Sequence, residues 1–206
     1  MRKSGRRKRG KYKSRCRKRS KCANPGGGKR KNANPAVKSR NKAGKELKQN
    51  EKTNVMRILD GKKIPYEAHS YEADPTLTGE QIAGILGEDP ERVFKTLVTQ
   101  GKTGAYYVFV VPVKGELNLK KAAKASGEKS IEMIKQKDLL GLTGYVHGGC
   151  SPIGMKKQFR TFIHETAATF EKMFVSAGKV GFQIELSPQD LISVARCEVT
   201  DIIGEN

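Results

Sequence analysis

The sequence predicts a mixed α/β (α+β) domain in which short strands follow one another and helices are interspersed irregularly. Three observations predict this class. Apolar runs bounded by glycine, proline and polar residues are typical of strands. Apolar residues at helical spacing occur only in short segments, and the regular β-α-β alternation of doubly wound folds is absent. No internal repeat is visible, so the 206 residues hold one domain with or without a tail.

The elements can be placed along the chain from these patterns. Helices are expected at 54–59, at 78–86 after the capping-box sequence that starts at Thr78, at 118–126, at 131–140, and from Ser187-Pro188 onward. Strands are expected at 66–72, 92–100, 105–112, 145–147, 161–164, 173–176, 183–186 and 197–203. The run 106–111 is apolar at every position, which predicts a strand buried on both faces.

Charge divides the chain into two parts. Residues 1–52 contain 22 Lys and Arg and two acids, whereas residues 53–206 contain 19 Lys and Arg and 19 acids. The first part has almost no large apolar residues and is expected to be a disordered polybasic tail. Such a tail favours polyanions such as RNA or DNA, but it could equally be a solvated leader or result from an assumed start upstream of the true one. The domain is expected over 53–206.

The four cysteines lie at 16, 22, 150 and 197 and form no C-x-x-C pair, so neither a zinc site nor a disulfide framework is expected. The sequence contains no membrane-spanning apolar run and no signal-peptide core. We therefore expect a cytoplasmic protein, with no metal and no cofactor.

Residues 148–154, here called the glycine loop, read Gly-Gly-Cys-Ser-Pro-Ile-Gly. Gly148 and Gly149 leave the backbone bare, so its N–H groups could cradle an oxygen-rich ligand. A tight connection between two strands explains the same pattern.

Lys95 lies inside an apolar strand pattern, between Phe94 and Leu97. Lysine is rare at such a position without a partner, so it could project into a cleft and stabilise developing negative charge. The alternative is a lysine that protects an edge strand from aggregation. Cys150 and His147 suggest a nucleophile and base, but their odd spacing favours a small buried thiol. His69 and His164 lie in predicted strands and are expected to be structural.

Several segments occur together in an order that resembles the YbaK/EbsC family, and more narrowly the Cys-tRNA(Pro)/Cys-tRNA(Cys) deacylases related to the editing domain of prolyl-tRNA synthetase. The resemblance covers about residues 53–206. The segments are Val93-Phe-Lys95-Thr-Leu, Leu119-Lys-Lys-Ala-Ala-Lys124, Thr143-Gly-Tyr, the glycine loop, Val175-Ser-Ala-Gly-Lys179 and Ile184-Glu-Leu186.

The resemblance implies a largely antiparallel, barrel-like sheet with surrounding helices. It also implies hydrolysis of mischarged aminoacyl-tRNA in trans, chiefly cysteine on tRNA(Pro). In the family's proposed mechanism the thiol of the substrate attacks its own ester and leaves as a thiolactone. The lysine that holds the ester and the terminal adenosine falls on Lys95.

Family positions for substrate binding fall on Tyr71, Thr96, Gly148, Gly149, Ser151, Ser176 and Gln183. Two departures concern specificity. Relatives have an aspartate where this chain has Gln183, which lacks the charge to pair with an α-ammonium group. The loop at 77–79 is shorter than in relatives and lacks their aromatic residue.

The resemblance implies mischarged tRNA as substrate and prolyl-tRNA synthetase as a partner. Another mischarged amino acid such as alanine, or a non-catalytic RNA-binding relative, remains an alternative. Lys120, Lys121, Lys124, Lys156 and Lys157 are candidate contacts for RNA. The oligomeric state is not predicted.

Overall fold

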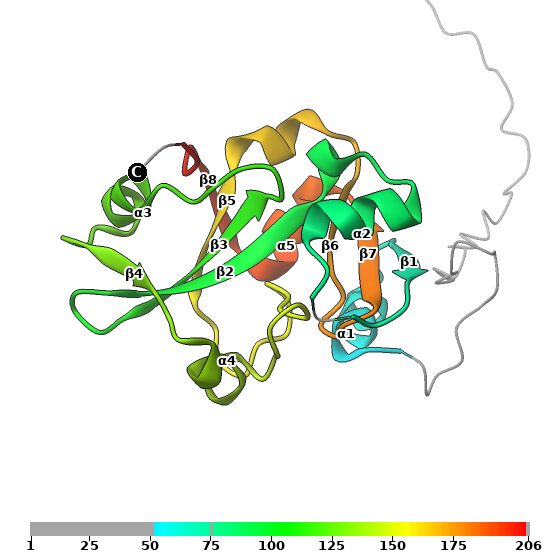
Figure 1. Ribbon diagram of the computed structural model, residues 1–206, viewed down its shortest axis with the longest axis horizontal. Coiled ribbons are helices and arrows are strands. Elements are labelled where there is room, and N and C mark those ends of the chain that lie inside the picture. The colour runs from blue at the N-terminus through cyan, green and yellow to red at the C-terminus, as the bar shows by residue number, and fades with distance from the viewer. Residues whose placement is uncertain (1–51, 75, 205–206) are drawn as a thin grey trace, which may run out of the picture. The chain divides into compact units, whose positions relative to one another are not determined.

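The computed structural model describes residues 52–74 and 76–204 of the chain (Figure 1). The helices are α1 (Asn54–Lys62), α2 (Gly79–Leu86), α3 (Leu119–Ser126), α4 (Gln136–Thr143) and α5 (Pro188–Ala195), with 3-10 turns at Pro90–Arg92 and Glu165–Thr169. The strands are β1 (Glu67–Ser70), β2 (Phe94–Gly101), β3 (Tyr106–Pro112), β4 (Ile131–Met133), β5 (Arg160–His164), β6 (Met173–Ser176), β7 (Phe182–Leu186) and β8 (Cys197–Thr200).

The strands form two sheets. One has the order β1-β7-β6 and is antiparallel throughout, and the other has the order β4-β2-β3-β5-β8. In the second sheet β4, β2 and β3 are antiparallel, whereas β3, β5 and β8 are parallel. A single parallel bridge between Val93 and Phe174 joins the two sheets. The mixed, largely antiparallel fold class is confirmed, and the described strands form two sheets that do not pair into a closed barrel.

The core lies on both sides of β3. Val108 and Val110 point into the larger cluster with α1, α5 and the three-stranded sheet, whereas Phe109 and Val111 point into a smaller cluster with α3. All four side chains are fully buried, as the continuous apolar run predicts. In the smaller cluster Phe109 stacks on Phe162 with ring centroids 5.1 Å apart.

Helix boundaries follow the capping residues. Thr78 and Gln81 form the complete capping box at the start of α2, and Ser187 caps α5 with Pro188 in its first turn. Asn118 caps α3 in the same way, with its side chain accepting from the N–H of Lys121. These starts were all predicted from the sequence.

The predicted helix at 131–140 is wrong. Ile131–Met133 instead form β4, which pairs with Thr99–Gly101 of β2, and the helix α4 begins only at Gln136. The open edge of β2 offers hydrogen-bonding partners that a local helix pattern does not reveal. The predicted helix therefore spans two elements with a break between them.

The predicted strand at 145–147 is also wrong. The N–H of Tyr145 donates to Thr143 Oγ1, and its buried hydroxyl donates to the carbonyl of Ile153 at 2.6 Å. These contacts fold Tyr145 against its own loop, so the segment has no neighbouring strand. The last strand ends at Thr200 instead of at 203, although Ile203 forms an isolated bridge with Leu117.

The predicted tail lies outside the described residues, apart from Lys52. The Lys52 ammonium forms an ion pair with Asp60 of α1 at 2.6 Å. In the part of the chain that is described, no helix combines the length and apolar character needed to cross a membrane.

Candidate functional site

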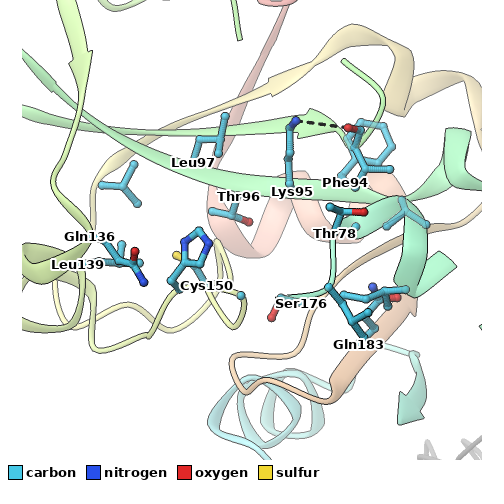
Figure 2. Close-up of a pocket in the computed structure, with 18 of the residues that line it drawn as sticks. Thr78, Phe94, Lys95, Thr96, Leu97, Gln136, Leu139, Cys150, Ser176 and Gln183 are labelled. Carbon is cyan, nitrogen blue, oxygen red and sulfur yellow. Dashed lines mark hydrogen bonds between the residues drawn. The ribbon is translucent and has the colours of Figure 1, made fainter. Parts of the chain in front are cut away.

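A cavity of about 410 Å³ runs along the edge of β2 (Figure 2). Its walls come from four places: β2 itself, the start of α2, the β4–α4 segment, and the glycine loop with the adjoining ends of β6 and β7. Gln136 and Leu139 line it from α4, and Ser176 and Gln183 line it from β6 and β7. Lys95 and Thr96 both line it from β2, but their side chains project from opposite faces of the strand: Thr96 points toward Cys150, and Lys95 points away from Ser176 and Gln183 (Figure 2).

The cavity occupies a gap in the sheet. Odd-numbered residues of β2 bond to β3, since Val93 O accepts from Val113 N and Gly101 N donates to Ala105 O. Even-numbered residues therefore direct their N–H and C=O groups toward the other edge. There β4 pairs only from Thr99 onward, and the bridge to β6 lies at Val93. Thr96 lies between these two points, so its backbone groups face the cavity.

Two buried polar atoms in the cavity wall lack protein partners. Thr96 Oγ1 and Gln183 Oε1 are almost completely shielded from solvent and form no hydrogen bond within the described part of the chain. Buried polar groups in native proteins are nearly always paired, and unpaired ones need a specific explanation. A ligand that donates to these oxygens is one such explanation.

Lys95 supplies the cation of the cavity. Its ammonium donates to the carbonyl of Val113 and contacts Glu116 Oε1, both at 3.3 Å (Figure 2 shows the first contact). The Glu116 side chain is 81% exposed, so the ion pair is weak and does not hold the ammonium in place. None of the described residues that line the cavity is an aspartate or a glutamate.

Ser176 and Gln183 lie directly opposite each other on β6 and β7, and Gln183 lies opposite His69 on β1. The three form one polar row on one face of the sheet. Tyr71 follows β1 and closes this end of the cavity, and burial raises the pKa of its phenol. The nearby carboxylate of Glu88 acts in the same direction. Tyr71 is therefore a neutral hydrogen-bonding group at physiological pH.

The structure brings Tyr71, Lys95, Thr96, Gly148, Ser176 and Gln183 together around the cavity, and it leaves out Gly149 and Ser151. The N–H of Gly149 donates to Val146 O, and Ser151 is fully buried, with its hydroxyl accepting from Ile153 N. Both residues make local hydrogen bonds and do not line the cavity.

Close packing accounts for the glycine at position 149. A Cβ at this position would lie 3.0 Å from the N of Val180 and 3.2 Å from the carbonyl carbon of Lys179. Only glycine lets the two backbones approach this closely.

Cys150 lines the cavity, but its thiol is unreactive. Burial raises the pKa of Cys150 to about 12, although a hydrogen bond with Thr143 opposes the shift. The thiol form is a poor nucleophile. Among the described residues no hydrogen bond joins Cys150 to His147, so the geometry contains no nucleophile–base pair.

Two walls of the cavity were not predicted. Leu77 and Thr78 contribute from the loop before α2, and Met133, Ile134 and Gln136 contribute from the β4–α4 break. Leu77 lines the cavity from the loop at 77–79, where the resemblance predicts an aromatic residue in relatives. The incorrect helix at 131–140 concealed the second wall.

One group of possible metal ligands lies apart from the lining of the cavity. Donor atoms of Glu67, His69 and Glu185 lie within 4.8 Å of one another. Glu185 is already paired with Arg92 at 2.6 Å and with Lys172 at 3.4 Å. These cations compensate the carboxylate, and the group gives no support for a metal in the cavity.

The chain is similar to one family and to several proteins whose names all concern aminoacyl-tRNA editing or prolyl-tRNA synthesis. The family described as "Aminoacyl-tRNA editing domain" matches residues 73–194. The Enterococcus faecalis protein EbsC, named as a candidate Cys-tRNA(Pro)/Cys-tRNA(Cys) deacylase, is 46% identical over 156 residues, which cover 75% of this chain and 95% of EbsC.

Two further comparisons point the same way. The proline–tRNA ligase of Thermosipho melanesiensis is 29% identical over 101 residues, which cover 49% of this chain and 17% of the ligase. A solved structure titled as a candidate trans-editing enzyme for prolyl-tRNA synthetase superposes with a TM-score of 0.63 at 21% identity, covering 74% of this chain and 99% of that one. The last comparison bears on the fold.

Proposed function

Because the chain belongs to the aminoacyl-tRNA editing domain family, we propose that it hydrolyses the ester of mischarged aminoacyl-tRNA in trans, chiefly cysteine on tRNA(Pro). The observation that carries this proposal is the chemistry of the cavity. It offers one lysine and unpaired buried oxygens, but no carboxylate and no reactive thiol. Such a site can position and polarise an ester, and it leaves the nucleophile to come from elsewhere.

The substrate can supply that nucleophile. The sulfur of the bound cysteine attacks the carbonyl carbon of its own ester, a C–S bond forms, and the ester C–O bond breaks. The thiol proton ends on the departing ribose hydroxyl of the terminal adenosine. The cysteine leaves as a thiolactone, which water then opens. The protein contributes mainly by holding the sulfur and the carbonyl in reacting geometry.

Within this proposal Lys95 stabilises the negative charge that develops on the carbonyl oxygen and on the departing ribose oxygen. Thr96 contributes its backbone N–H at the gap in the sheet, and Gly148 contributes exposed backbone on the opposite wall. Ser176, Gln183 and Tyr71 hold the amino acid end. Gln183 is neutral, so it binds the α-amino group by hydrogen bonding without an ion pair.

The test is a panel of charged tRNAs incubated with the full chain: Cys-tRNA(Pro), Ala-tRNA(Pro), Ser-tRNA(Pro), Pro-tRNA(Pro) and Cys-tRNA(Cys). Cys-tRNA(Pro) should be hydrolysed much faster than Ser-tRNA(Pro), because a hydroxyl is the weaker internal nucleophile. Faster hydrolysis of Ala-tRNA(Pro) would instead assign the site to alanine. If none of the charged tRNAs is hydrolysed, the protein is a non-catalytic relative.

The role of Lys95 is tested by Lys95→Ala, which should lower kcat/KM by about 100-fold, the typical loss for one donor to a developing oxyanion. Lys114→Ala is the matched control. Lys114 is also close to Val113, but its ammonium pairs with Glu91 on the surface and does not line the cavity. Equal rates for Lys95→Ala and wild type would refute the assigned role.

We also propose that residues 1–52 add salt-dependent affinity for tRNA through their 22 Lys and Arg. Removing them should weaken tRNA binding at low salt and leave it almost unchanged at high salt. No change at low salt would show that this segment does not bind RNA. A partnership with prolyl-tRNA synthetase stays a prediction of the resemblance.

A further inference from the structure

A second cavity, of about 400 Å³, is also lined by the glycine loop. Pro152, Ile153 and Gly154 of the loop line it, whereas His147, Gly148 and Cys150 line the first cavity. One segment of backbone therefore forms a wall of both cavities. The other walls of the second cavity come from the end of α1, from residues 155–161, and from the end of α5.

The second cavity is cationic. Lys62, Lys157 and Arg196 line it, and its described lining includes no acidic residue. All three side chains belong to exposed residues, and none of them forms an ion pair with another described residue. By contrast, Lys121 pairs with Asp201 at 2.6 Å, Lys114 with Glu91 at 2.7 Å and Arg160 with Glu198 at 2.6 Å. The domain has no net charge, so three uncompensated cations around one cavity form a local site for an anion.

The backbone at this cavity provides an independent observation. All five helices end in a left-handed residue, and α2, α3 and α4 have glycine there, as Gly87, Gly127 and Gly144. The two helices that end at the second cavity, α1 and α5, instead have Lys63 and Arg196, with φ of 58° and 55°. They are the only non-glycine residues of positive φ in the described chain. Glycine would relieve the strain at both positions. Arg196 lines the second cavity and Lys63 does not, so only the Arg196 side chain supports a use at this site that offsets the strain.

We propose that the second cavity binds the sugar–phosphate backbone of the tRNA whose aminoacyl end enters the first cavity. A phosphodiester carries a negative charge that can pair with the three cations Lys62, Lys157 and Arg196. The guanidinium of Arg196 can also bind two phosphate oxygens at once. Gln158 and Ser193 are exposed on the same lining and add neutral groups for ribose. This assignment rests on the proposed function for the identity of the RNA, and it deepens that function by naming the surface that holds the substrate.

The test compares two triple variants of the full chain. Lys62→Gln/Lys157→Gln/Arg196→Gln removes the cavity cations. Lys102→Gln/Lys114→Gln/Lys129→Gln removes the same charge from exposed positions that line neither cavity. Binding of uncharged tRNA(Pro) is measured from about 50 to 300 mM salt, where each lost phosphate contact lowers the slope of log affinity against log salt by 0.7 to 0.9. The cavity variant should lose about two in slope and bind about 10- to 100-fold more weakly near physiological salt. The basic residues of 1–52 are present in every protein and cancel in the comparison.

A slope equal to wild type in the cavity variant, or an equal loss of slope in the control variant, would overturn the proposal. Because uncharged tRNA is used, the outcome is independent of catalysis: a protein that fails to deacylate can still show the slope change. With charged substrate, the cavity variant should raise KM and leave kcat unchanged.

Arg196→Gly separates binding from a purely structural role. It removes the side chain and also the left-handed strain, so the melting temperature should rise while tRNA affinity falls. A rise in melting temperature with unchanged affinity would show that Arg196 has no part in binding.

Discussion

Replacing Thr96 by valine should make the protein more stable and less active. Thr96 Oγ1 is buried in the wall of the first cavity and lacks a protein partner among the described residues. An unsatisfied buried hydroxyl costs about 1 to 3 kcal/mol, and valine has nearly the same shape without the polar atom. Thr96→Val should therefore raise the free energy of unfolding by about 1 kcal/mol, which corresponds to about 2 to 4 °C in melting temperature for a domain of this size.

The same substitution removes a group that the ligand is proposed to satisfy. The loss of one hydrogen bond in the transition state, about 1.4 kcal/mol, corresponds to a tenfold lower kcat/KM on Cys-tRNA(Pro). The stability of wild type and of Thr96→Val is measured by urea unfolding, with one m-value fitted to both proteins. Their activity is measured by single-turnover deacylation. The two readouts should move in opposite directions.

Thr99→Val is the matched control on the same strand. Thr99 is fully buried, but its hydroxyl donates to Tyr107 O at 3.4 Å and it does not line the cavity. This variant should lose about 1 kcal/mol of stability and keep its activity. If Thr96→Val is destabilised as much as Thr99→Val, the hydroxyl of Thr96 has a partner inside the protein, and the assignment of its unpaired oxygen to a ligand is refuted.

Three further outcomes follow from the geometry. Cys150→Ala should retain kcat within about twofold. The wild-type Cys150 thiol should react only slowly with iodoacetamide at neutral pH, because its pKa is raised to about 12. A large loss of activity in Cys150→Ala would show that Cys150 takes part in the reaction. Gly149→Ala should destabilise the protein by about 1 to 3 kcal/mol, because the added Cβ would press on the backbone of Val180. Gly61 lies in α1 with open space around it, so Gly61→Ala should stabilise the protein by up to about 1 kcal/mol. Chemical unfolding measures both changes. Burial lowers the pKa of His164, so the folded state disfavours the charged imidazole. The free energy of unfolding should therefore fall as the pH drops below about 6.5. His164→Gln should flatten this pH dependence, and an unchanged slope would show that another group causes it.

Local sequence predicted most elements because local chemistry determines them. The capping box at Thr78 and the Ser187-Pro188 start fix helix ends through bonds within one turn. The apolar run of β3 shows its burial directly. The helix expected at 131–140 failed because its first residues complete the edge of β2, some thirty residues earlier in the chain, and that partner is invisible to a local pattern.

The residues of the candidate site also fall into those that the sequence could predict and those that it could not. Lys95 could be singled out because a lysine inside an apolar strand is unusual, whereas Thr96, Ser176 and Gln183 came from the resemblance. The walls from α2 and from the β4–α4 break could not be predicted, since they become walls only when β4 stops pairing at Thr99 and leaves the gap beside Thr96. The gap is a property of the strand register, which local composition does not contain.

The glycines at 149 and 154 are explained by close packing and not by the cradle of N–H groups that the sequence suggests. The bare backbone of the glycine loop predicted a cradle of N–H groups, yet the N–H of Gly149 is used inside the loop and Ser151 is buried. Close packing explains Gly149 and Gly154: Gly149 lies against the backbone of Val180, and the carbonyl of Gly154 accepts from Asn54 of α1. The loop packed in this way contributes to both cavities: Gly148 and Cys150 line the first, and Pro152, Ile153 and Gly154 line the second. In the two proposals the first half of the loop therefore contacts the ester end of the substrate and the second half contacts its phosphate backbone, so a substitution that disturbs the packing at Gly149 should affect both contacts.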